Sequence, residues 1–316
     1  MFVVIGTTTV DLFLSGLDQL PATPEADEFT NDNFSFCEEP LRAVLGGNAG
    51  SAFTLARLGA DVTVSSAVGA DHFGKLARRW HAQAGVDVSA LAEVETATST
   101  TTVLSDGDLN RRSFHHPGAT AAFAPGMLDG ALLDKTEVLL VSGYPLLERW
   151  RPEGVRHALA HASGAGAVTA LDIGPAVGDP ARGDELVDLL PFLDYLIANE
   201  HELAVCTGRE DLGEATARTV DAGAERVVVK QGGGGAVLHH KGRAEPLQAP
   251  AFTVEARFTV GAGDAFNAGL LFGVSQGWKA ERVLRFGNAV AALVVQNARG
   301  VLGSPDQQDA EALMAS

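Results

Sequence analysis

The sequence has few cysteines and no long hydrophobic segment. Its 316 residues include only two cysteines, Cys37 and Cys206, too few for a disulfide framework or a cysteine-rich zinc site. The longest apolar runs, such as Ala289–Val295, are far shorter than the ~20 residues that cross a bilayer. The opening residues, MFVVIG, carry no basic segment ahead of an apolar one, so no signal peptide is expected. We therefore expect a cytoplasmic protein without a membrane partner.

Basic residues are also scarce. Lys and Arg total 23 against 40 Asp and Glu, which gives a formal net charge of −17 at pH 7. A surface of this sign repels a phosphate backbone, so we expect no nucleic-acid partner. Any phosphate that this protein binds must lie in a local positive field, made by backbone N–H groups, a helix N-terminus or a metal ion.

Several common catalytic motifs are missing. No glycine-rich turn ends in the Lys-Ser/Thr of a P-loop, and no G-x-G-x-x-G follows the first strand-like segment. There is no H-E-x-x-H, and no G-x-S-x-G stands between a strand and a helix. His115 and His116 form a pair without a third ligand, which fits a surface better than a metal site. The missing dinucleotide motif also argues against a dehydrogenase.

Short apolar segments alternate with segments that carry apolar residues at helical spacing. Asn48–Leu58 has this spacing and stops at Gly59, and Phe73–Ala84 stops at Gly85. Such alternation predicts a parallel sheet covered by helices on both faces. Strand-like segments are Phe2–Gly6, Val62–Val68, Val138–Val141, Val168–Asp172, Tyr195–Ala198 and Val227–Val229. Further helices are expected at Pro152–Ser163, Asp184–Leu190, Leu212–Gly223, Ala265–Gln276 and Ala280–Ala298.

Residues 12–45 and 96–118 interrupt this alternation, because neither contains a convincing helix. Thr98–Ser105 and Arg112–His115 are rich in threonine and aromatic residues, with the turn signal Ser105-Asp106-Gly107-Asp108 between them. We interpret the two segments as insertions that form a small antiparallel sheet within a single domain of residues 1–316. Such a sheet could close over an active site as a lid.

The sharpest local signal is Gly261-Ala262-Gly263-Asp264, directly before a long predicted helix. Glycines let the backbone turn tightly, and the free N–H groups and dipole of a helix N-terminus attract anions. A carboxylate at Asp264, beside a bound phosphate, suits a base that takes a proton from an attacking hydroxyl group. The same residues also fit a glycine-rich turn in which Asp264 only caps the helix.

Three further signals are weaker in isolation. Gly46-Gly47-Asn48-Ala49-Gly50-Ser51 opens a helix and also fits an ordinary turn. An apolar strand is followed by Asn199-Glu200-His201-Glu202. The side-chain oxygens of this segment suit a hydrated Mg²⁺, but the segment also fits a solvated helix start. Lys230-Gln231-Gly232-Gly233-Gly234-Gly235 resembles a turn against which a nucleotide could lie flat.

In this order and spacing, the four signals resemble the ribokinase-like (PfkB) family of carbohydrate kinases over essentially the whole chain. The N-terminal signature is matched by Gly46-Gly47 and by Ala67-Val68-Gly69-Ala70-Asp71, and the C-terminal one by Gly261–Phe266. The resemblance implies a three-layer α/β/α sandwich with a mostly parallel central sheet and a small β-sheet lid. It also implies transfer of the ATP γ-phosphoryl group to a hydroxymethyl group of a sugar or sugar derivative.

The resemblance also implies a role for each matching residue. Asp264 is the catalytic base, and Gly261, Ala262 and Gly263 form the anion hole. The implied substrate-binding residues are Asp11, Gly46, Gly47, Asn48 and Ser51, to which we add Phe114 from the lid. The implied residues around ATP are Asn199, Lys230, Gly232, Gly235 and Asn288, and the N-x-x-E motif with Glu200 and Glu202 implies Mg²⁺.

Three positions depart from the family pattern. Ser51 stands where the family usually has Asn, and Lys230 where many members carry Thr. Phe258-Thr259-Val260 replaces the usual Asp-Thr-Thr. In relatives activated by K⁺ that Asp contributes to the ion site. A phenyl ring cannot ligate an ion, so we expect K⁺ activation to be weak or absent.

The acceptor and the assembly stay open at this stage. A sugar phosphate or acid would suit Arg42, Arg111 and Arg112 of the lid, whereas a nucleoside would suit Phe34, Phe36 and Phe114. A non-catalytic sugar-binding regulatory protein is a further alternative, but such a protein has no reason to keep Asp264 together with a full anion hole. An exposed lid face could also pair two subunits into a homodimer.

Overall fold

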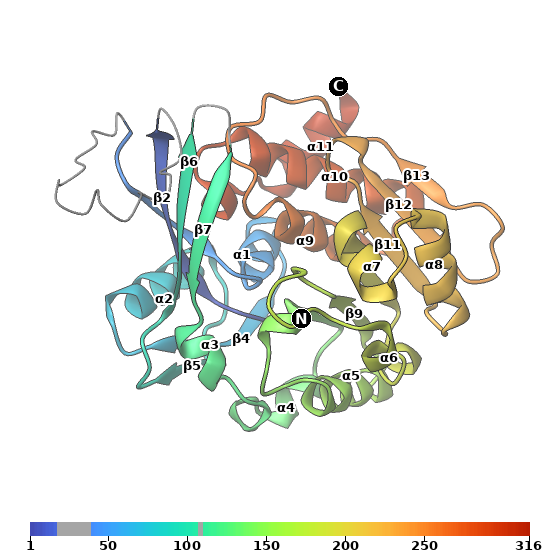
Figure 1. The fold of residues 1–316 in the computed structure, drawn as a ribbon, viewed down its shortest axis with the longest axis horizontal. Helices are drawn as coiled ribbons and strands as arrows, with labels where there is room; N and C mark the ends of the chain where they lie inside the picture. Colours follow the sequence, from blue (N-terminus) through green and yellow to red (C-terminus); the bar gives the residue numbers. More distant parts are fainter. Residues whose placement is uncertain (18–38, 107–109) are drawn as a thin grey trace, which may run out of the picture.

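The computed structural model describes residues 1–17, 39–106 and 110–316 and confirms the expected fold class. Most of the expected insertion at residues 12–45, with Phe34, Phe36 and Cys37, lies outside the described residues. Figure 1 shows a large central sheet between two layers of helices, with a second, smaller sheet standing beside it. Among the helices of the described ranges, none is long and apolar enough to cross a membrane.

Nine strands make the central sheet. They are β1 Phe2–Ile5, β4 Val62–Gly69, β5 Leu91–Val94, β8 Val138–Ser142, β9 Val168–Asp172, β10 Tyr195–Asn199, β11 Arg226–Lys230, β12 Ala236–His240 and β13 Leu247–Ala249. Their order is β13-β12-β11-β10-β9-β8-β1-β4-β5, and all neighbours are parallel except β11–β12 and β12–β13. The direction of strand addition therefore reverses between β1 and β8, which is where open α/β sheets bind ligands.

Helices cover both faces of this sheet. They are α1 Gly50–Arg57, α2 His72–Ala84, α3 Gly118–Ala122, α4 Gly130–Leu133, α5 Glu153–Gly164, α6 Gly183–Leu186, α7 Glu200–Thr207, α8 Leu212–Asp221, α9 Ala262–Ser275, α10 Ala280–Gln296 and α11 Gln307–Ala315. The expected helix at Asp184–Leu190 is wrong in its extent, because only the short α6 forms. Residues 187–189 form a turn, and Leu190–Phe192 makes a 3-10 helix with Pro191 in its first turn.

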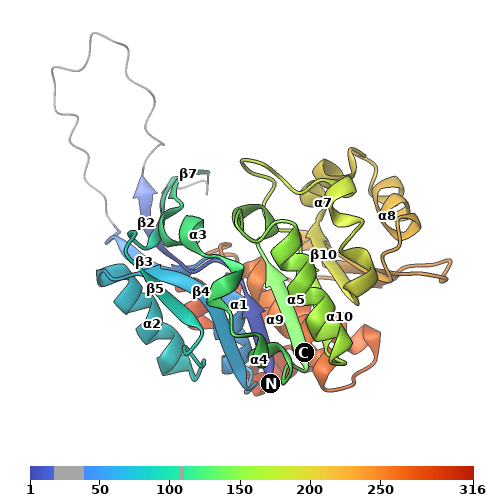
Figure 2. The same cartoon turned by 90° about the horizontal axis from the view of Figure 1, so that it is seen from below.

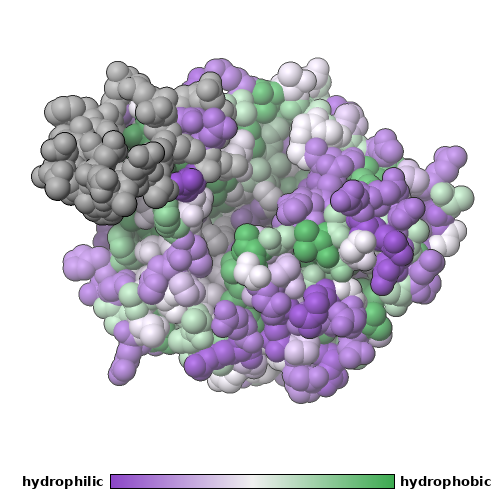
Figure 3. Space-filling view, viewed as in Figure 1, coloured by the Kyte–Doolittle hydropathy of each residue, from purple (hydrophilic) through white to green (hydrophobic). Residues whose placement is uncertain are grey.

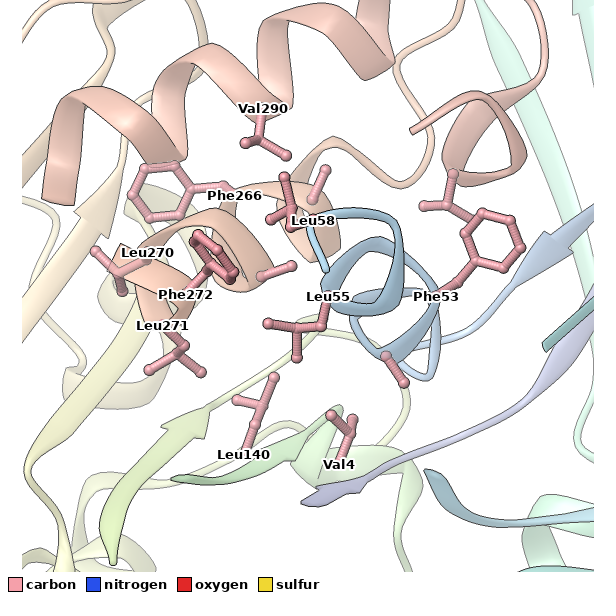
Figure 4. Close-up of a cluster of buried hydrophobic side chains, with 14 of the residues drawn as sticks. Val4, Phe53, Leu55, Leu58, Leu140, Phe266, Leu270, Leu271, Phe272 and Val290 are labelled. Carbon is pink, nitrogen blue, oxygen red and sulfur yellow. The ribbon is translucent and has the colours of Figure 1, made fainter. Parts of the chain in front are cut away.

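Alternate residues of each central strand enter two separate hydrophobic cores. Val4 and Leu140 belong to the core beneath α1, α9 and α10, which Figure 4 shows with Phe266 and Leu271 packed above the sheet. Val3, Ile5 and Leu139 point to the opposite face and join the core beneath α5, α7 and α8. Because both faces are buried, these strands are continuously apolar rather than alternating.

The smaller sheet stands off the helical layers (Figure 2). It contains β3 Arg42–Gly46, β2 Thr9–Leu17, β6 Ser99–Asp106 and β7 Arg111–His116, in that order. The expectation of a purely antiparallel sheet is wrong, because β2 pairs with β6 in parallel. The two strands are separated by β3, α1, β4, α2 and β5, so no hairpin fixes their relative direction.

Candidate active site

The carboxyl ends of the central strands bring together residues that lie far apart in the sequence. Asp172 ends β9, Asn199 ends β10 and Lys230 ends β11. The lid strand β2 follows β1 directly and carries Asp11. Figure 3 shows that the surface is hollowed between the small sheet and the side of the molecule that carries α7.

The N-terminus of α9 carries the glycine-rich turn that was expected to form the anion hole. Gly261 is the N-cap of α9, in a left-handed conformation with φ of 85°. A Cβ atom there would lie 2.7 Å from a methyl group of Val301, so both the backbone and the space require glycine. The N–H groups of Gly263 and Asp264 have no partner within the helix, and that of Ala262 makes only a long bond of 3.5 Å to the Thr259 carbonyl oxygen, which makes this terminus suitable for a phosphate group.

Asp264 lies in the first turn of α9 rather than at its cap, so the simple capping interpretation does not apply. The Ser51 hydroxyl group lies 3.3 Å from its Oδ1 and 3.1 Å from its carbonyl oxygen. Burial, together with the negative charge of Asp172, raises the pKa of Asp264 to about 7, while Lys230 acts in the opposite direction. A carboxylate with this pKa can accept a proton near neutral pH.

Asp11 and Gly46 face each other across the pair β2–β3. A Cβ atom at Gly46 would collide with the Asp11 carboxylate, so the sheet leaves space for this side chain only because residue 46 is glycine. Thr9 donates a hydrogen bond of 2.8 Å to Asp11 Oδ1, and Thr101 hydrogen-bonds the same carboxylate. Burial raises the pKa of Asp11, and these two hydroxyl groups partly offset the rise.

Gly47 and Asn48 connect β3 to α1 beside the end of β1. Gly47 has a φ of 75° and packs against the backbone of Thr7. The Thr7 hydroxyl group donates to Asn48 Oδ1 at 3.1 Å and accepts a bond from the Asn48 backbone N–H at 3.2 Å. Gly143 lies directly against the Asn48 amide. Among the predicted substrate residues, Ser51 contacts Asp264 directly and Asp11 is close enough for its charge to act on Asp264, while Gly46, Gly47 and Asn48 lie where β3 leads into α1.

Phe114 is not brought together with these residues. The strand registers place Asp11 opposite Thr101 and Thr101 opposite His115, so these three side chains share one face of the lid. Phe114 is the neighbour of His115 on β7; it points to the other face and is 57% exposed. His115 was not expected on this face; its Nδ1 lies 3.1 Å from the Thr101 hydroxyl group. Strand alternation alone could not identify it without the register.

A second cavity, of about 650 Å³, opens on the other side of the anion hole. It is lined by backbone and apolar side chains of the β11–β12 turn, of the segment before α9, and of α9 and α10. The predicted nucleotide-site residues Asn199, Lys230, Gly232, Gly235 and Asn288 all line it, with Ala262 and Gly263 at its inner end. Asn288 donates to the carbonyl oxygens of Ala249 and Pro250, so its amide also holds one wall in place.

The N-x-x-E motif forms the cap of α7. The Asn199 side chain accepts a hydrogen bond from the Glu202 N–H, and the Glu202 carboxylate accepts one from the Asn199 N–H. Burial and the charge of Asp172 raise the pKa of Glu202 to about 7. Glu200 instead accepts a bond from Gln231 at the surface. Within the described ranges, no three His, Cys, Asp or Glu side chains are arranged to hold a metal by themselves.

Lys230 and Asp172 form an ion pair between the two halves of the site. Lys230 Nζ lies 3.1 Å from Asp172 Oδ2, and both side chains are largely buried, with exposed fractions of 14% and 5%. Asp172 was not expected in the site. The available signal was a polar residue at the end of an apolar strand, a position that Asn199 shares.

Phe258 fills the place where an ion-binding Asp was expected. Its backbone N–H and that of Arg257 both donate to the carbonyl oxygen of Val295. Its ring packs edge-on against Phe13, with ring centroids 4.4 Å apart, and lies against Gly300. The Val295 carbonyl oxygen, which this segment packs against, is therefore already bonded to protein donors.

Comparison with known proteins agrees with this architecture. Residues 25–307 match the family described as pfkB family carbohydrate kinase. Ribokinase of Haemophilus influenzae is 27% identical over 289 residues, which cover 89% of this chain and 90% of that protein. The ATP-dependent ribose-1-phosphate kinase of Halopiger xanaduensis is 32% identical over 251 residues, 78% of this chain and 79% of that protein.

The solved structures show the same fold. Ribokinase of Arabidopsis thaliana, complexed with ribose and ATP, superposes with a TM-score of 0.83 at 24% identity and covers 100% of this chain and 98% of its own. Ribokinase of Thermotoga maritima gives 0.80 at 23% identity, covering 100% and 99%. Together with the family match, the two-sheet architecture shows that the chain belongs to the pfkB family of carbohydrate kinases, enzymes that transfer a phosphoryl group to an alcohol.

Proposed function

We propose that the protein transfers the γ-phosphoryl group of ATP to a hydroxymethyl group of a sugar or sugar derivative. The observation that carries this proposal is the position of Asp264. It lies on the anion-binding terminus of α9, between the acceptor-side residues Asp11 and Asn48 and the cavity lined by Gly232 and Asn288. A base at that point can meet a hydroxyl group from one side while the transferred phosphoryl group is held from the other.

Each group of residues has a separate task in this reaction. Asp11 orients acceptor hydroxyl groups, because its carboxylate is buried and held by two threonines. Asp264 takes the proton from the attacking hydroxyl group, and its pKa of about 7 suits that transfer. The N–H groups of Ala262 and Gly263 stabilise the negative charge on the phosphoryl oxygens as it is transferred.

The residues around the nucleotide cavity also fit Mg²⁺. The carboxylates of Asp172, Glu202 and Asp264 all act on the Lys230 ammonium group next to this cavity, and burial, followed by the charge of Asp172, raises the pKa of Glu202 and Asp264. Mg²⁺ prefers such oxygen ligands and keeps several of its waters. Asn199, Glu200 and Glu202 would hold it through water, and the ion would neutralise phosphate charge.

Replacement of Asp264 by Asn tests the catalytic assignment. The change keeps the shape of the side chain and removes the base, so turnover should fall by ~10²–10⁴ while ATP binding is retained. The acceptor for this assay comes from a screen of ATP consumption with sugars, sugar phosphates and nucleosides. In the wild type, kcat/KM should rise with pH through about 7, as Asp264 loses its proton.

Asp221→Asn is the matched control, because Asp221 is exposed at the end of α8 and the same chemical change should leave turnover unaltered. Near-normal turnover in Asp264→Asn would reject the base assignment. Failure of the wild type to phosphorylate any acceptor in the screen would favour a non-catalytic sugar-binding protein.

A further inference from the structure

The ammonium group of Lys230 lies beside the anion hole, and not near the outer end of the nucleotide cavity. The side chain leaves the end of β11, and its Nζ would be 3.5 Å from a Cβ atom built on Gly263. It donates to Asp172 Oδ2 at 3.1 Å and to Asn267 Oδ1 at 3.5 Å. An ammonium group has three N–H donors, and the described residues supply these two partners, so one donor is left for a bound group.

Asp172 is a fixed carboxylate. It is 4% exposed, at the end of a buried strand. Gly174 N–H donates to its Oδ1 at 3.1 Å, whereas Lys230, the Asn267 amide and the Ser142 hydroxyl group converge on Oδ2. A carboxylate with donors from three surrounding elements has little freedom to move, so it can define where the Lys230 ammonium group stands.

We propose that Asp172 is a positioning residue, which holds Lys230 beside the anion hole so that its ammonium group contacts the phosphoryl group being transferred. This inference rests on the proposed function. Asn267 completes the arrangement from α9, because its amide donates to Asp172 while its oxygen faces Lys230. The same helix carries the anion hole and Asp264, so Asn267 connects the Asp172–Lys230 pair to the element that carries the base.

The surrounding charges explain why a positioning residue is needed. Three carboxylates act on the Lys230 ammonium group: Asp172 from β9, Glu202 from α7 and Asp264 from α9. Burial alone would lower the pKa of Lys230, but Asp172 and Glu202 more than offset it and raise the pKa. Without Asp172, Lys230 would be drawn toward Asp264, where it would occupy the carboxylate that must receive the acceptor's proton. Asp172 keeps the cation and the base apart.

Nucleotide binding tests this inference without any acceptor. The probes are ADP and the non-hydrolysable triphosphate AMP-PNP, each with Mg²⁺, titrated calorimetrically into the wild type, Asp172→Asn, Lys230→Met and the double variant. The quantity compared is the affinity for AMP-PNP relative to ADP, which isolates contacts with the terminal phosphate. Lys230→Met should lower this ratio by ~10-fold or more, the size expected for a charged hydrogen bond.

Asp172→Asn separates a positioning role from a purely electrostatic one, because the two roles predict opposite changes in the AMP-PNP/ADP affinity ratio. Removing a negative charge near a phosphate would by itself strengthen triphosphate binding. Loss of the Lys230 position should instead lower the AMP-PNP/ADP ratio by several-fold. In the Lys230→Met background, Asp172→Asn should cause no further loss, because the residue acts through Lys230. A raised ratio in the wild-type background, or equal losses in both backgrounds, overturns the inference.

Asn267→Ala provides a second test should Asp172→Asn fail to fold. It removes the amide that bridges the pair without changing any charge, and it should lower the ratio with Lys230 present and leave it unchanged in Lys230→Met. A wild type that binds neither ADP nor AMP-PNP rejects the proposed function itself. Binding of both nucleotides with a ratio that moves the other way rejects only the role of Asp172.

Discussion

At the scale of single residues, the site concentrates ionisable groups that are buried or largely buried. Asp172, Glu202, Lys230 and Asp264 are held by strand ends and by the first turns of α7 and α9. Burial, and after it the charge of Asp172, raises the pKa of both Glu202 and Asp264, so each pKa is determined by the surroundings of the group rather than by its residue type. This coupling gives a carboxylate that can serve as a base near neutral pH.

His81 is a buried ionisable group away from the site, and it should make the fold sensitive to acid. It lies on α2 with an exposed fraction of 0%, and neither ring nitrogen has a hydrogen-bond partner among the described residues. Burial lowers its pKa from 6.5 to about 4. Between pH 6.5 and pH 4, His81 binds a proton in the unfolded chain but stays neutral in the folded protein. The contribution of neutral His81 to the free energy of unfolding should therefore be completely present above pH 6.5. The free energy of unfolding should fall by about 3 kcal/mol as the pH drops toward 4.

Urea unfolding at pH 7.5 and at pH 5 measures this effect. His81→Leu should flatten the pH dependence in this window, because it removes the proton uptake of the unfolded state. His72→Leu is the control, since His72 is exposed on the same helix, and it should keep the slope of the wild type. Equal slopes in the wild type and His81→Leu would show that other groups cause any acid sensitivity.

Candidate site residues could be predicted from the sequence where residues a few positions away form a recognisable pattern with them. Asp264 follows glycines at a helix start, and Gly46 and Gly47 stand before another, so their roles depend on neighbours within a few positions. Asp172 ends an apolar strand, but no helix start follows it directly. Its partners Lys230 and Asn267 lie 58 and 95 positions further along the chain, and only the parallel order of β9, β10 and β11 brings them together.

At the scale of elements, periodicity predicted which segments are helices and strands, because continuous apolar strands and amphipathic helices follow from burial. It could not predict how the lid strands pair. Phe114 was expected at the substrate, yet the register β2–β6–β7 assigns that face to His115. A shift of one position moves a side chain to the other face of a sheet, so the aromatic content of β7 was not enough to place it.

The segment that precedes α9 should make the enzyme insensitive to K⁺. Phe258 replaces a carboxylate, and its ring lies against Gly300. The N–H groups of Arg257 and Phe258 bond the carbonyl oxygen of Val295, and Arg42 Nη1 lies 3.4 Å from that of Ala298. Oxygens that accept bonds from protein donors are poor ligands for a weakly held ion. Initial rates in K⁺ and in tetramethylammonium, at equal ionic strength, should agree within about twofold, since screening is then the same in both.

Phe258→Asp is the comparison for the K⁺ dependence of the rate, because it places a carboxylate at residue 258 and leaves the residues of the anion hole unchanged. A K⁺-specific stimulation of the wild type by an order of magnitude would show that backbone carbonyl groups alone build an ion site there.

At the scale of the whole molecule, the small sheet has two unlike faces. Its inner face carries Asp11, Thr101 and His115 toward the site. Near the body, its outer face is covered by packing of Leu45 and Val10 into the main core. Further out, the register gives this face a row of incompletely buried apolar side chains: Leu12, Leu14, Leu104 and Phe114. Such a surface on a sheet that stands off the body suits association with a second copy.

The outer face of the lid should therefore pair two chains into a symmetric dimer. Light scattering at micromolar concentration should give twice the mass of one chain. Phe114→Asp should shift the protein toward the monomer, because it places a charge within an apolar contact that each subunit contributes. His115→Ala, one residue away on the inner face, should leave the dimer intact, so the pair separates an effect of the face from an effect of altering β7. A monomeric wild type would contradict the pairing. Equal dissociation of the two variants would show that β7 itself, rather than its outer face, determines assembly. The lid would then serve only the site, with Asp11 presented by a sheet whose other side faces water.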